Sequence, residues 1–330
     1  MLANQLGLSI STVSKALSDS HEISAGTKQR VNKLVQQLDY TPNPYASSLK
    51  TRNSKNIGVV IPEVADSFFA QAINGIESVA QEKGYHVLIY LSHENFEKEK
   101  KILKDVESGR VDGVLMSVAR ETTQHYHIDA LMNKKVPLVF FDRVMDNVAA
   151  AKITTNDFES AYLATCHLIE KGCRQILFLS FSASLSISRK RLEGYKKALL
   201  DGKITFKPGN IISFDNDAKK AYSLLKNKLK QAKNGAGIIA SVEKLALPVY
   251  KACEELQLSI PADVQLICFS NVDTAAFLNP PLTTITQPAF EMGKTAATLL
   301  VKALERKHFI LPPEEIVITA ELVLRKSTKE

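Results

Sequence analysis

From residue 57 to the C-terminus the chain alternates between short apolar runs and longer amphipathic segments, and this alternation constrains its fold more than any other feature. A short apolar run without polar alternation is typical of a strand buried on both faces of a parallel sheet. The segments between the runs have the apolar spacing of helices, which return the chain to the same sheet. The pattern therefore predicts an α/β fold with doubly wound sheets.

The alternation comes in two rounds. The first round has strands expected at 57–61, 87–91, 113–116 and 138–141, with helices at about 67–83, 96–108 and 122–133. The second round begins with a helix at about 157, and its strands are expected at 176–179, 211–212, 237–240 and 264–268, with helices at about 186–201, 217–230 and 243–257. A last helix at about 289–306 and strands near 316–318 and 322–324 follow. Two such sets predict two lobes with a cleft where the strand order reverses, because one core rarely grows so large.

Residues 1–55 lack this strand pattern and predict three short helices instead. Gly7 is expected to end the first helix, and the Ser9 hydroxyl can cap a second helix over residues 10–17. Val13 and Leu17 are four residues apart and would face inward. The outward face of the second helix would then carry Ile10, Ser11, Ser14 and Lys15. Short hydroxyl side chains let a helix lie close to base edges in the major groove of DNA.

A third helix is expected to begin at Ser24 or Thr27. Its inward stripe would be Val31, Leu34, Val35 and Leu38, and its solvated face Lys28, Arg30 and Lys33. Residues 1–55 contain seven Lys or Arg and three Asp or Glu, an excess that suits contact with phosphates. On charge alone, a three-helix bundle with a solvated basic face is an equally good interpretation. The turn after Gly7 and the hydroxyl-rich second helix favour DNA binding.

Two motifs in this region are specific when they occur together: Leu8-Ser-Ile-Ser-Thr-Val-Ser-Lys-Ala-Leu17 and Tyr40-Thr-Pro-Asn-Pro-Tyr-Ala-Ser-Ser-Leu-Lys50. They resemble the lactose-repressor (LacI/GalR) family of bacterial transcription regulators, and the resemblance runs essentially to the C-terminus. It implies an all-α helix-turn-helix DNA-binding domain over 1–42, a hinge helix and linker over 43–55, and an effector-binding and dimerisation domain over 56–330. The last is two-lobed and periplasmic-binding-protein-like, with lobe 1 at about 56–156 and 286–318 and lobe 2 at about 157–285 and 319–330.

The resemblance also implies which residues contact DNA. Ile10, Ser11 and Lys15 would meet base edges, and Leu49 would be an apolar wedge in the minor groove, where unstacking costs a few kcal/mol. Contacts to the DNA backbone would come from Ser9, Ser14, Ser18, Ser24, Thr27 and Tyr40, and the set is completed by Thr12, Asn43 and Lys50. The hinge is too short to be stable alone in water, so we expect it to become helical only on DNA beside a partner hinge.

Two departures from the family pattern lie in this part. Lys15 stands where the family usually has Arg. A guanidinium, which can donate two parallel hydrogen bonds to one base, is thereby replaced by an ammonium, which acts as a point charge. The family's first helix normally starts several residues earlier, whereas here Met1 falls inside it. We therefore expect that the true start of this helix is missing, a loss of about 0.5–2 kcal/mol if a cap goes with it.

The effector-binding residues implied by the resemblance are Phe68, Asn156, Asp157, Arg191 and Ser270. Phe68 would be an apolar platform, Arg191 would grip the ligand, and Asn156 and Asp157 match a polar pair in reversed order. Ser270 stands where the family commonly has Asp, and Asp66-Ser67 and Val242-Glu243 replace Asn-Pro and Asn-Asp. A pocket with one acceptor fewer is expected to take a different ligand, since unpaired buried polar groups cost about 1–3 kcal/mol. A sugar or sugar phosphate is expected first, and a nucleobase is the alternative.

Each of these residues also has a plain structural interpretation. Phe68 alone fits a core residue, and Asp157 fits a helix cap. Arg191 belongs to the run Arg189-Lys190-Arg191, which is typical of a solvated face. Only the spacing of Arg191 to Gly194-Tyr195 favours a place in the pocket.

Catalytic and cofactor chemistry finds little support. The sequence lacks a nucleophile elbow, a phosphate-binding Gly-rich loop and a His-Glu-x-x-His pair. His125 and His127 are two apart and would point to different helix faces, and the four cysteines lack metal spacing, so no cofactor or metal is expected. The four thiols, with no membrane-spanning stretch or signal peptide, predict a cytoplasmic protein.

Three functions remain: a ligand-gated homodimeric regulator of double-stranded operator DNA, a sugar-binding transport component, and an enzyme of doubly wound fold. The second needs a signal peptide and the third a nucleophile or phosphate motif, so the sequence favours the first, most simply a repressor.

Overall fold

The computed structural model describes residues 2–38, 54–215, 217–232, 235–306 and 310–329. The chain divides into two compact units, Met1–Ser54 and Lys55–Glu330. The expected hinge helix, with Tyr40, Asn43, Leu49 and Lys50, lies outside the described residues.

Residues 2–38, the described part of the first unit, contain three helices: α1 (Leu2–Leu6), α2 (Ile10–Leu17) and α3 (Ala25–Gln37). Gly7 ends α1 with a φ of 66°, the left-handed conformation that glycine adopts without strain. Helices α1, α2 and α3 pack through a small core of Leu2, Ala3, Val13, Ala16 and Val31. Leu38 was expected in the inward stripe but is 41% exposed, because it caps the C-terminus of α3 beyond the last helical turn.

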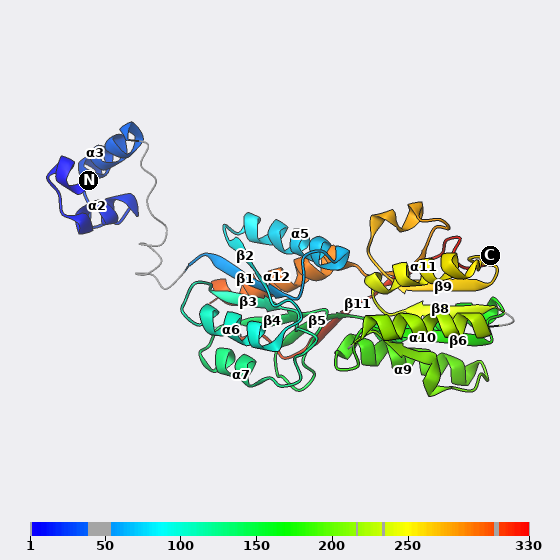
Figure 1. Cartoon of the computed structure of the whole chain (residues 1–330). Helices are drawn as coiled ribbons and strands as arrows, with labels where there is room; N and C mark the ends of the chain where they lie inside the picture. The colour runs from blue at the N-terminus through cyan, green and yellow to red at the C-terminus, as the bar shows by residue number, and fades with distance from the viewer. Residues whose placement is uncertain (1, 39–53, 216, 233–234, 307–309, 330) are drawn as a thin grey trace. The chain divides into compact units, whose positions relative to one another are not determined.

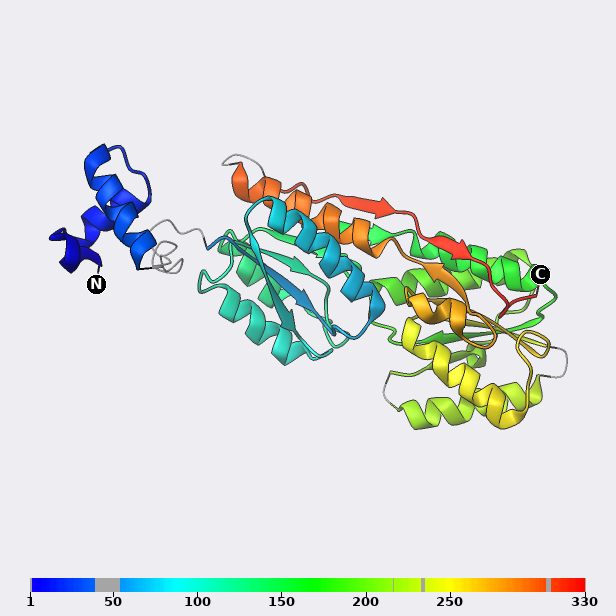
Figure 2. The same cartoon turned by 90° about the horizontal axis from the view of Figure 1, so that it is seen from above.

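The second unit contains two lobes, each built on a six-stranded sheet (Figure 1). In lobe 1 the strand order is β11-β5-β4-β3-β1-β2 and all pairs are parallel. Its strands are β1 (Asn56–Ile61), β2 (His86–Leu91), β3 (Gly113–Met116), β4 (Leu138–Phe141), β5 (Ala151–Thr155) and β11 (Glu315–Ile318). Its helices are α5 (Ser67–Glu82), α6 (Phe96–Val106), α7 (Tyr126–Asn133) and α12 (Ala289–Glu305). Helices α5 and α12 lie side by side on one face, and α6 and α7 cover the other (Figures 1 and 2).

In lobe 2 the order is β12-β10-β9-β8-β6-β7, which repeats that of lobe 1. Only the last pair differs, since β12 runs antiparallel to β10. The strands are β6 (Gln175–Ser180), β7 (Ile211–Ser213), β8 (Ala236–Ala240), β9 (Val264–Phe269), β10 (Thr283–Thr286) and β12 (Glu321–Val323). The helices are α8 (Asp157–Glu170), α9 (Ser186–Asp201), α10 (Ala218–Gln231) and α11 (Ala246–Leu256), with short 3-10 helices η1 (Pro208–Asn210), η2 (Glu243–Leu245) and η3 (Asp273–Phe277).

The chain crosses between the lobes three times: after β5, after β10 and after β11. Strands β5 and β10 were not expected from the sequence. Their Thr and Lys residues interrupt the apolar run that marks the other strands, although most of these side chains are buried. Two helices also differ from expectation. Helix α7 begins only at Tyr126, and the segment 243–257 is divided into η2 and α11, with Pro248 in the first turn of α11.

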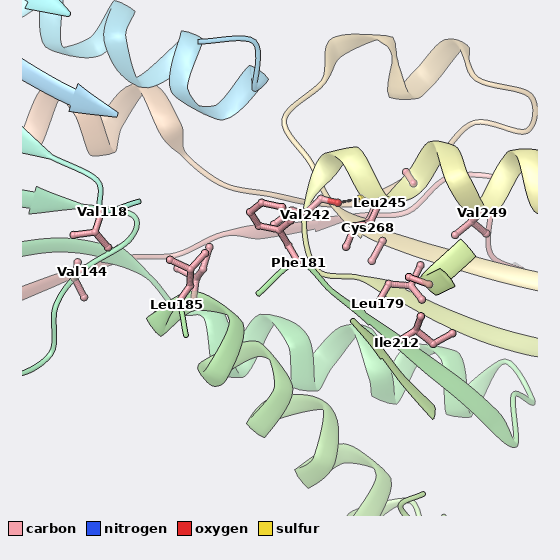
Figure 3. Packing of buried hydrophobic residues seen from close by; sticks show 14 of the residues in the cluster. Val118, Val144, Leu179, Phe181, Leu185, Ile212, Val242, Leu245, Val249 and Cys268 are labelled. Atoms are coloured by element: carbon pink, nitrogen blue, oxygen red, sulfur yellow. Dashed lines mark hydrogen bonds between the residues drawn. The ribbon is translucent and has the colours of Figure 1, made fainter. Parts of the chain in front are cut away.

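The lobes are in contact through one continuous hydrophobic cluster. Val118 and Val144 of lobe 1 belong to the same cluster as Phe181 and Leu185 of lobe 2 (Figure 3). Burial of apolar surface therefore helps to hold the lobes together beside the cleft.

Candidate DNA-reading helix and effector cleft

Helix α2 presents a polar, sterically open face to solvent. Ile10 is 82% exposed, and Ser11 and Ser14 are exposed, whereas Val13 is buried in the core. Lys15 is half-buried and forms an ion pair with Glu22. A surface pair of this kind is worth only about 0–1 kcal/mol, so Lys15 can exchange Glu22 for another acceptor.

The other hydroxyl residues expected at DNA serve in the structure as helix caps. Ser9 accepts a hydrogen bond from the Thr12 backbone N–H at 3.0 Å, and Ser24 accepts one from the Thr27 N–H at 3.3 Å. The Ser18 hydroxyl donates to the carbonyl of Ser14 at 3.1 Å. These bonds fix the ends of α2 and α3, and they leave Ile10, Ser11 and Ser14 as the free outward face of α2.

The cleft is built from residues that directly follow the strands. In an open α/β sheet the loops at the carboxyl ends of the strands form the binding crevice. Here a narrow cavity of about 20 Å³ lies between the lobes. Its polar lining consists of Asp66 after β1, Asp142 and Arg143 after β4, Glu243 after β8, Ser270 and Asn271 after β9, Gln287 after β10, and Arg191 from α9. A wider cavity of about 320 Å³ shares Asp66, Phe69, Arg143, Glu243 and Ser270 with it.

Arg191 is the most deeply buried cation of the cleft, with an exposed fraction of 1%. Its Nε donates to Asp157 Oδ1 at 2.6 Å, its Nη1 donates to the Ser241 carbonyl, and its guanidinium lies 3.9 Å from the centroid of the Phe269 ring. Its Nη2 is buried and has no hydrogen-bond partner in the described chain. Because an unsatisfied buried donor is costly, this N–H is poised for an acceptor on a ligand.

Asp157 forms an ion pair with Arg191 but does not itself line the cavity. Burial raises the pKa of the Asp157 carboxyl, and the neighbouring Arg191 charge opposes that rise. The ion pair is therefore what allows a carboxylate to remain in this dry position.

Glu243 joins the two lobes and supplies a carboxylate beside Ser270. It accepts hydrogen bonds from the hydroxyls of Ser67 in lobe 1 and Ser270 in lobe 2, both at 2.9 Å, and from the Asn271 N–H at 3.2 Å. Position 243 is acidic in the family pattern as well, so this carboxylate does not replace the one absent at position 270, and the smaller number of acceptors stays a prediction.

Asp142 and Arg143 add a second charged pair at the end of β4. Burial raises the pKa of Asp142 to about 6, although Arg143 and Arg191 lower it. Arg143 donates to Glu94 at 2.9 Å, and its buried Nε has no hydrogen-bond partner among the described residues. The cleft thus presents carboxylate oxygens and guanidinium N–H groups side by side.

The structure brings Phe68, Arg191 and Ser270 together in the narrow cavity. Phe68 is buried and packs edge-to-face on Phe69, with ring centroids 5.4 Å apart. Asn156 was expected in the pocket but does not line it. Its Oδ1 accepts from the Ser160 hydroxyl at 3.2 Å and from the Ala320 N–H at 2.8 Å, so it ties the start of α8 to a crossover segment.

Sequence reasoning missed Asp142, Arg143, Phe269, Asn271 and Gln287 as cleft residues. All of them end or closely follow a strand, and two of these strands, β4 and β9, follow from the apolar pattern alone. The polar residues after each apolar run were thus a usable signal for Asp142, Arg143 and Asn271. Gln287 follows β10, which the pattern did not reveal.

Further polar contacts cross the cleft. The Gln71 and Asn271 side chains meet at 3.0 Å, and the Gln71 amide also donates to the Asn271 carbonyl at 3.0 Å. Arg120 of lobe 1 donates to the Asp215 carbonyl of lobe 2 at 2.9 Å. Because these contacts depend on the lobe arrangement, they favour the one observed.

Two negative findings apply to the described part of the chain. It contains no group of three or more His, Cys, Asp or Glu side chains that could hold a metal ion. None of its helices is both long and apolar enough to cross a bilayer.

Two family models match the chain. Residues 2–43 match the model described as bacterial regulatory proteins, lacI family, and residues 165–328 match a periplasmic binding protein-like domain. The HTH-type transcriptional repressor PurR of Photobacterium profundum is 30% identical over 335 residues, which cover 100% of this chain and 98% of that protein. The ribose operon repressor of Haemophilus influenzae is 29% identical and covers 99% and 97%. The lac repressor dimer bound to operator and the anti-inducer ONPF has the same fold, with a TM-score of 0.81, 24% identity and coverage of 99% and 97%.

Proposed function

The chain belongs to the lacI family of bacterial regulatory proteins, and from this premise we propose that it represses transcription by binding operator DNA under the control of a small ligand in the interlobe cleft. It is accordingly a regulator and not an enzyme. The observation that carries the proposal is the free outward face of α2, where Ile10, Ser11 and Ser14 are exposed on a helix capped by Ser9. As a protein that acts on chromosomal DNA, it works in the cytoplasm.

The proposed ligand is a small sugar. Sugar hydroxyls both donate and accept hydrogen bonds, which matches the carboxylates of Asp66 and Asp142 beside the free N–H groups of Arg143 and Arg191. The wider cavity of about 320 Å³ shares Asp66 and Arg143, but not Asp142 or Arg191, with the narrow cavity. Its volume is at the lower end of the range for small-molecule sites, which suits a monosaccharide. The acidic lining disfavours a sugar phosphate, because like charges repel strongly where water is excluded. The similarity to a ribose operon repressor points in the same direction.

Coupling to DNA would pass through lobe 1. The chain leaves the first unit at residue 54 and enters β1 at once, and the Lys55 N–H there donates to Asp112 at 2.8 Å. A ligand bound to Arg191 and Asp142 would strengthen or weaken the contacts Glu243–Ser67 and Gln71–Asn271, which join the two lobes across the cleft. A shift between lobe arrangements would then change DNA affinity, typically by about 1–3 kcal/mol.

The protein is proposed to act as a homodimer, since two half-sites of an operator need two helix-turn-helix units. An apolar cavity of about 1030 Å³ lies between α10 and α11 of lobe 2, and its lining includes Leu247, which is 63% exposed. Phe277, on η3, is 86% exposed. Exposed apolar patches of this kind mark protein contacts, so a second copy of the chain is the proposed occupant.

The test is selection of duplexes from fragmented genomic DNA by the full chain. We expect one related set of sequences to be enriched, and Ser11→Ala and Lys15→Ala to weaken binding by about 1–3 kcal/mol with relaxed base preference. The matched control is Lys33→Ala, which changes an exposed cation on α3 and should weaken binding to all sequences alike. Enrichment of no sequence, or equal effects of the α2 and α3 variants, would refute the assignment.

A further inference from the structure

A second polar cavity lies at the end of lobe 2 opposite to the cleft. It has a volume of about 250 Å³, and three cations line it: Arg174, Lys207 and Lys228. Its location follows from the topology. Arg174 and Gln175 stand at the amino end of β6, and Lys207 and Asn210 stand at the amino end of β7, whereas the cleft residues stand at the carboxyl ends of parallel strands. The length of a strand, about 20 Å, therefore separates this cavity from the effector cleft.

Three elements converge to place the cations together. Arg174 precedes β6, Lys207 begins the turn of η1, and Lys228 lies in the last turn of α10. A Cβ atom added at Gly209 would lie 3.5 Å from Lys228 Nζ, so the Lys228 ammonium lies close to the η1 backbone. The Lys228 side chain is half-buried, as expected of an aliphatic stem that packs while its charge stays accessible.

The positive charge of this cavity is uncompensated. No Asp or Glu lines it, and across the described ranges none of the three cations lies within 4.0 Å of a carboxylate oxygen. Some other lysines of lobe 2 are paired, as Lys226 is with Glu255 at 2.6 Å. Like charges gathered in a concave site repel one another and concentrate a positive potential, which an anion would relieve.

The remaining lining suits a phosphate in particular. A guanidinium offers parallel N–H donors that match phosphate oxygens, and lysines add point charges. The amides of Gln175 and Asn210 provide neutral polar groups, and Asn210 is only 8% exposed. Ile176 and Ile204 form an apolar wall against which a small organic group could pack.

We propose that this cavity binds a phosphate-bearing small molecule, either a phosphate ester or a free oligophosphate, independently of the effector cleft. The site does not depend on the sugar assigned to the cleft, since the two cavities share no residue.

The test is isothermal titration of the full chain, without DNA and at low ionic strength, with inorganic pyrophosphate and with ribose 5-phosphate as separate probes. We expect at least one probe to bind, and Lys207→Gln/Lys228→Gln to weaken that binding by about tenfold or more, as the loss of charged hydrogen bonds implies. The control Lys219→Gln changes an exposed lysine of α10 that does not line the cavity and should leave binding unchanged. Arg191→Gln, in the cleft, should also leave it unchanged.

Binding of pyrophosphate alone would assign a free oligophosphate, and binding of ribose 5-phosphate would assign an ester. The proposal is overturned if neither probe binds in the millimolar range, or if the double variant binds as tightly as the wild type. It is equally overturned if Arg191→Gln abolishes binding under conditions where it is folded, because the probe would then occupy the cleft. Thermal melting of each variant identifies the temperatures at which it is folded, and the titrations are compared only there. This matters most for Arg191→Gln, which loses a buried ion pair.

Discussion

The two lobes share one strand order but differ in the charges that they bring to the cleft. Both sheets place the same succession of strand ends at the interlobe boundary, and only the terminal strand changes direction, from parallel β11 to antiparallel β12. Lobe 2 contributes Arg191, which is neutralised within its own lobe by Asp157 at 2.6 Å. Lobe 1 contributes Asp142, whose pKa of about 6 shows that burial outweighs the nearby cations. The scaffold is therefore repeated, whereas the site is assembled from unlike halves.

This contrast has a thermodynamic consequence. A buried ion pair such as Arg191–Asp157 is stable only while both members are present. Removal of one member leaves the other as a buried, unpaired charge. A buried carboxylate that lacks full compensation opposes folding when ionised. Variants of the two lobes should therefore affect stability in opposite directions.

The largest effect is expected for Arg191→Met in lobe 2. The substitution leaves Asp157 buried without its cation and should destabilise the protein by about 3–5 kcal/mol. Arg189→Met is the matched control, because Arg189 is on the same helix but its ion pair with Asp146 is half-exposed and worth about 0–1 kcal/mol. Urea unfolding measures both, and similar losses would mean that Arg191 is not held as described.

Asp142→Asn in lobe 1 is expected to change the free energy of unfolding in the opposite direction, that is, to stabilise the protein. The folded-state pKa of about 6 exceeds the ordinary value of 3.8, so the folded state binds the proton more tightly than the unfolded state does. The ionised group therefore destabilises the fold at full strength above about pH 6, and this loss is recovered as the pH falls toward about 4. At about pH 7 the variant should be more stable than wild type by up to ~3 kcal/mol, at 1.36 kcal/mol per pKa unit.

Urea midpoints of wild type and Asp142→Asn across this pH range check the assignment. The difference between the two proteins should shrink steadily below about pH 6. A difference that does not change with pH would show that Asp142 is not the titrating group.

A tightly packed helix pair is a feature that the two lobes share. In lobe 1, a Cβ at Gly293 would lie 2.0 Å from the Ala72 carbonyl oxygen of α5, and in lobe 2 a Cβ at Gly194 would lie 2.1 Å from the Phe158 oxygen of α8. Gly293→Ala and Gly194→Ala should each destabilise by about 1–3 kcal/mol or more, because backbone must move. Gly26→Ala on α3 meets nothing within 4 Å and should instead stabilise by about 0.4–1 kcal/mol. If Gly26→Ala lowered the melting temperature as much as the other two substitutions do, the close packing of the helix pairs would be contradicted.

The smallest effect concerns the contacts that cross the cleft. Gln71→Ala removes two hydrogen bonds to Asn271 and should weaken the observed lobe arrangement by about 1–2 kcal/mol. Gln81→Ala, an exposed change on the same helix, is the control. Small-angle scattering should show a larger radius of gyration for Gln71→Ala only. Identical scattering profiles for the two variants would show that Gln71 does not hold the two lobes together.

Much of the fold follows from local sequence signals. The range 186–201 predicted for one helix is that of α9, and the Ser9 cap begins α2 where expected, because capping and apolar periodicity act within a few residues. Strands β5 and β10 were not predicted because their Thr-rich sequences become buried only through tertiary packing.

The cleft was less predictable because its bonds are long-range. Glu243 and Ser270 meet only because β8 and β9 are neighbours in the sheet, and Glu243 reaches Ser67 only because the lobes touch. For the same reason, Asn156 could not be separated from Asp157 by position alone, although only Asp157 holds Arg191.

The most direct test of the central claim is the affinity of the full chain for its selected DNA duplex, measured by fluorescence anisotropy with and without pentoses and hexoses. For wild type, we expect one sugar to change the Kd by about 5- to 150-fold, the coupling typical of a two-state regulator. At a temperature where melting shows Arg191→Gln to be folded, this variant should bind the duplex with unchanged affinity in the absence of sugar and show no response to it. A sugar that changes the Kd of Arg191→Gln as much as that of wild type would contradict the account, because control of DNA binding would then bypass the cleft.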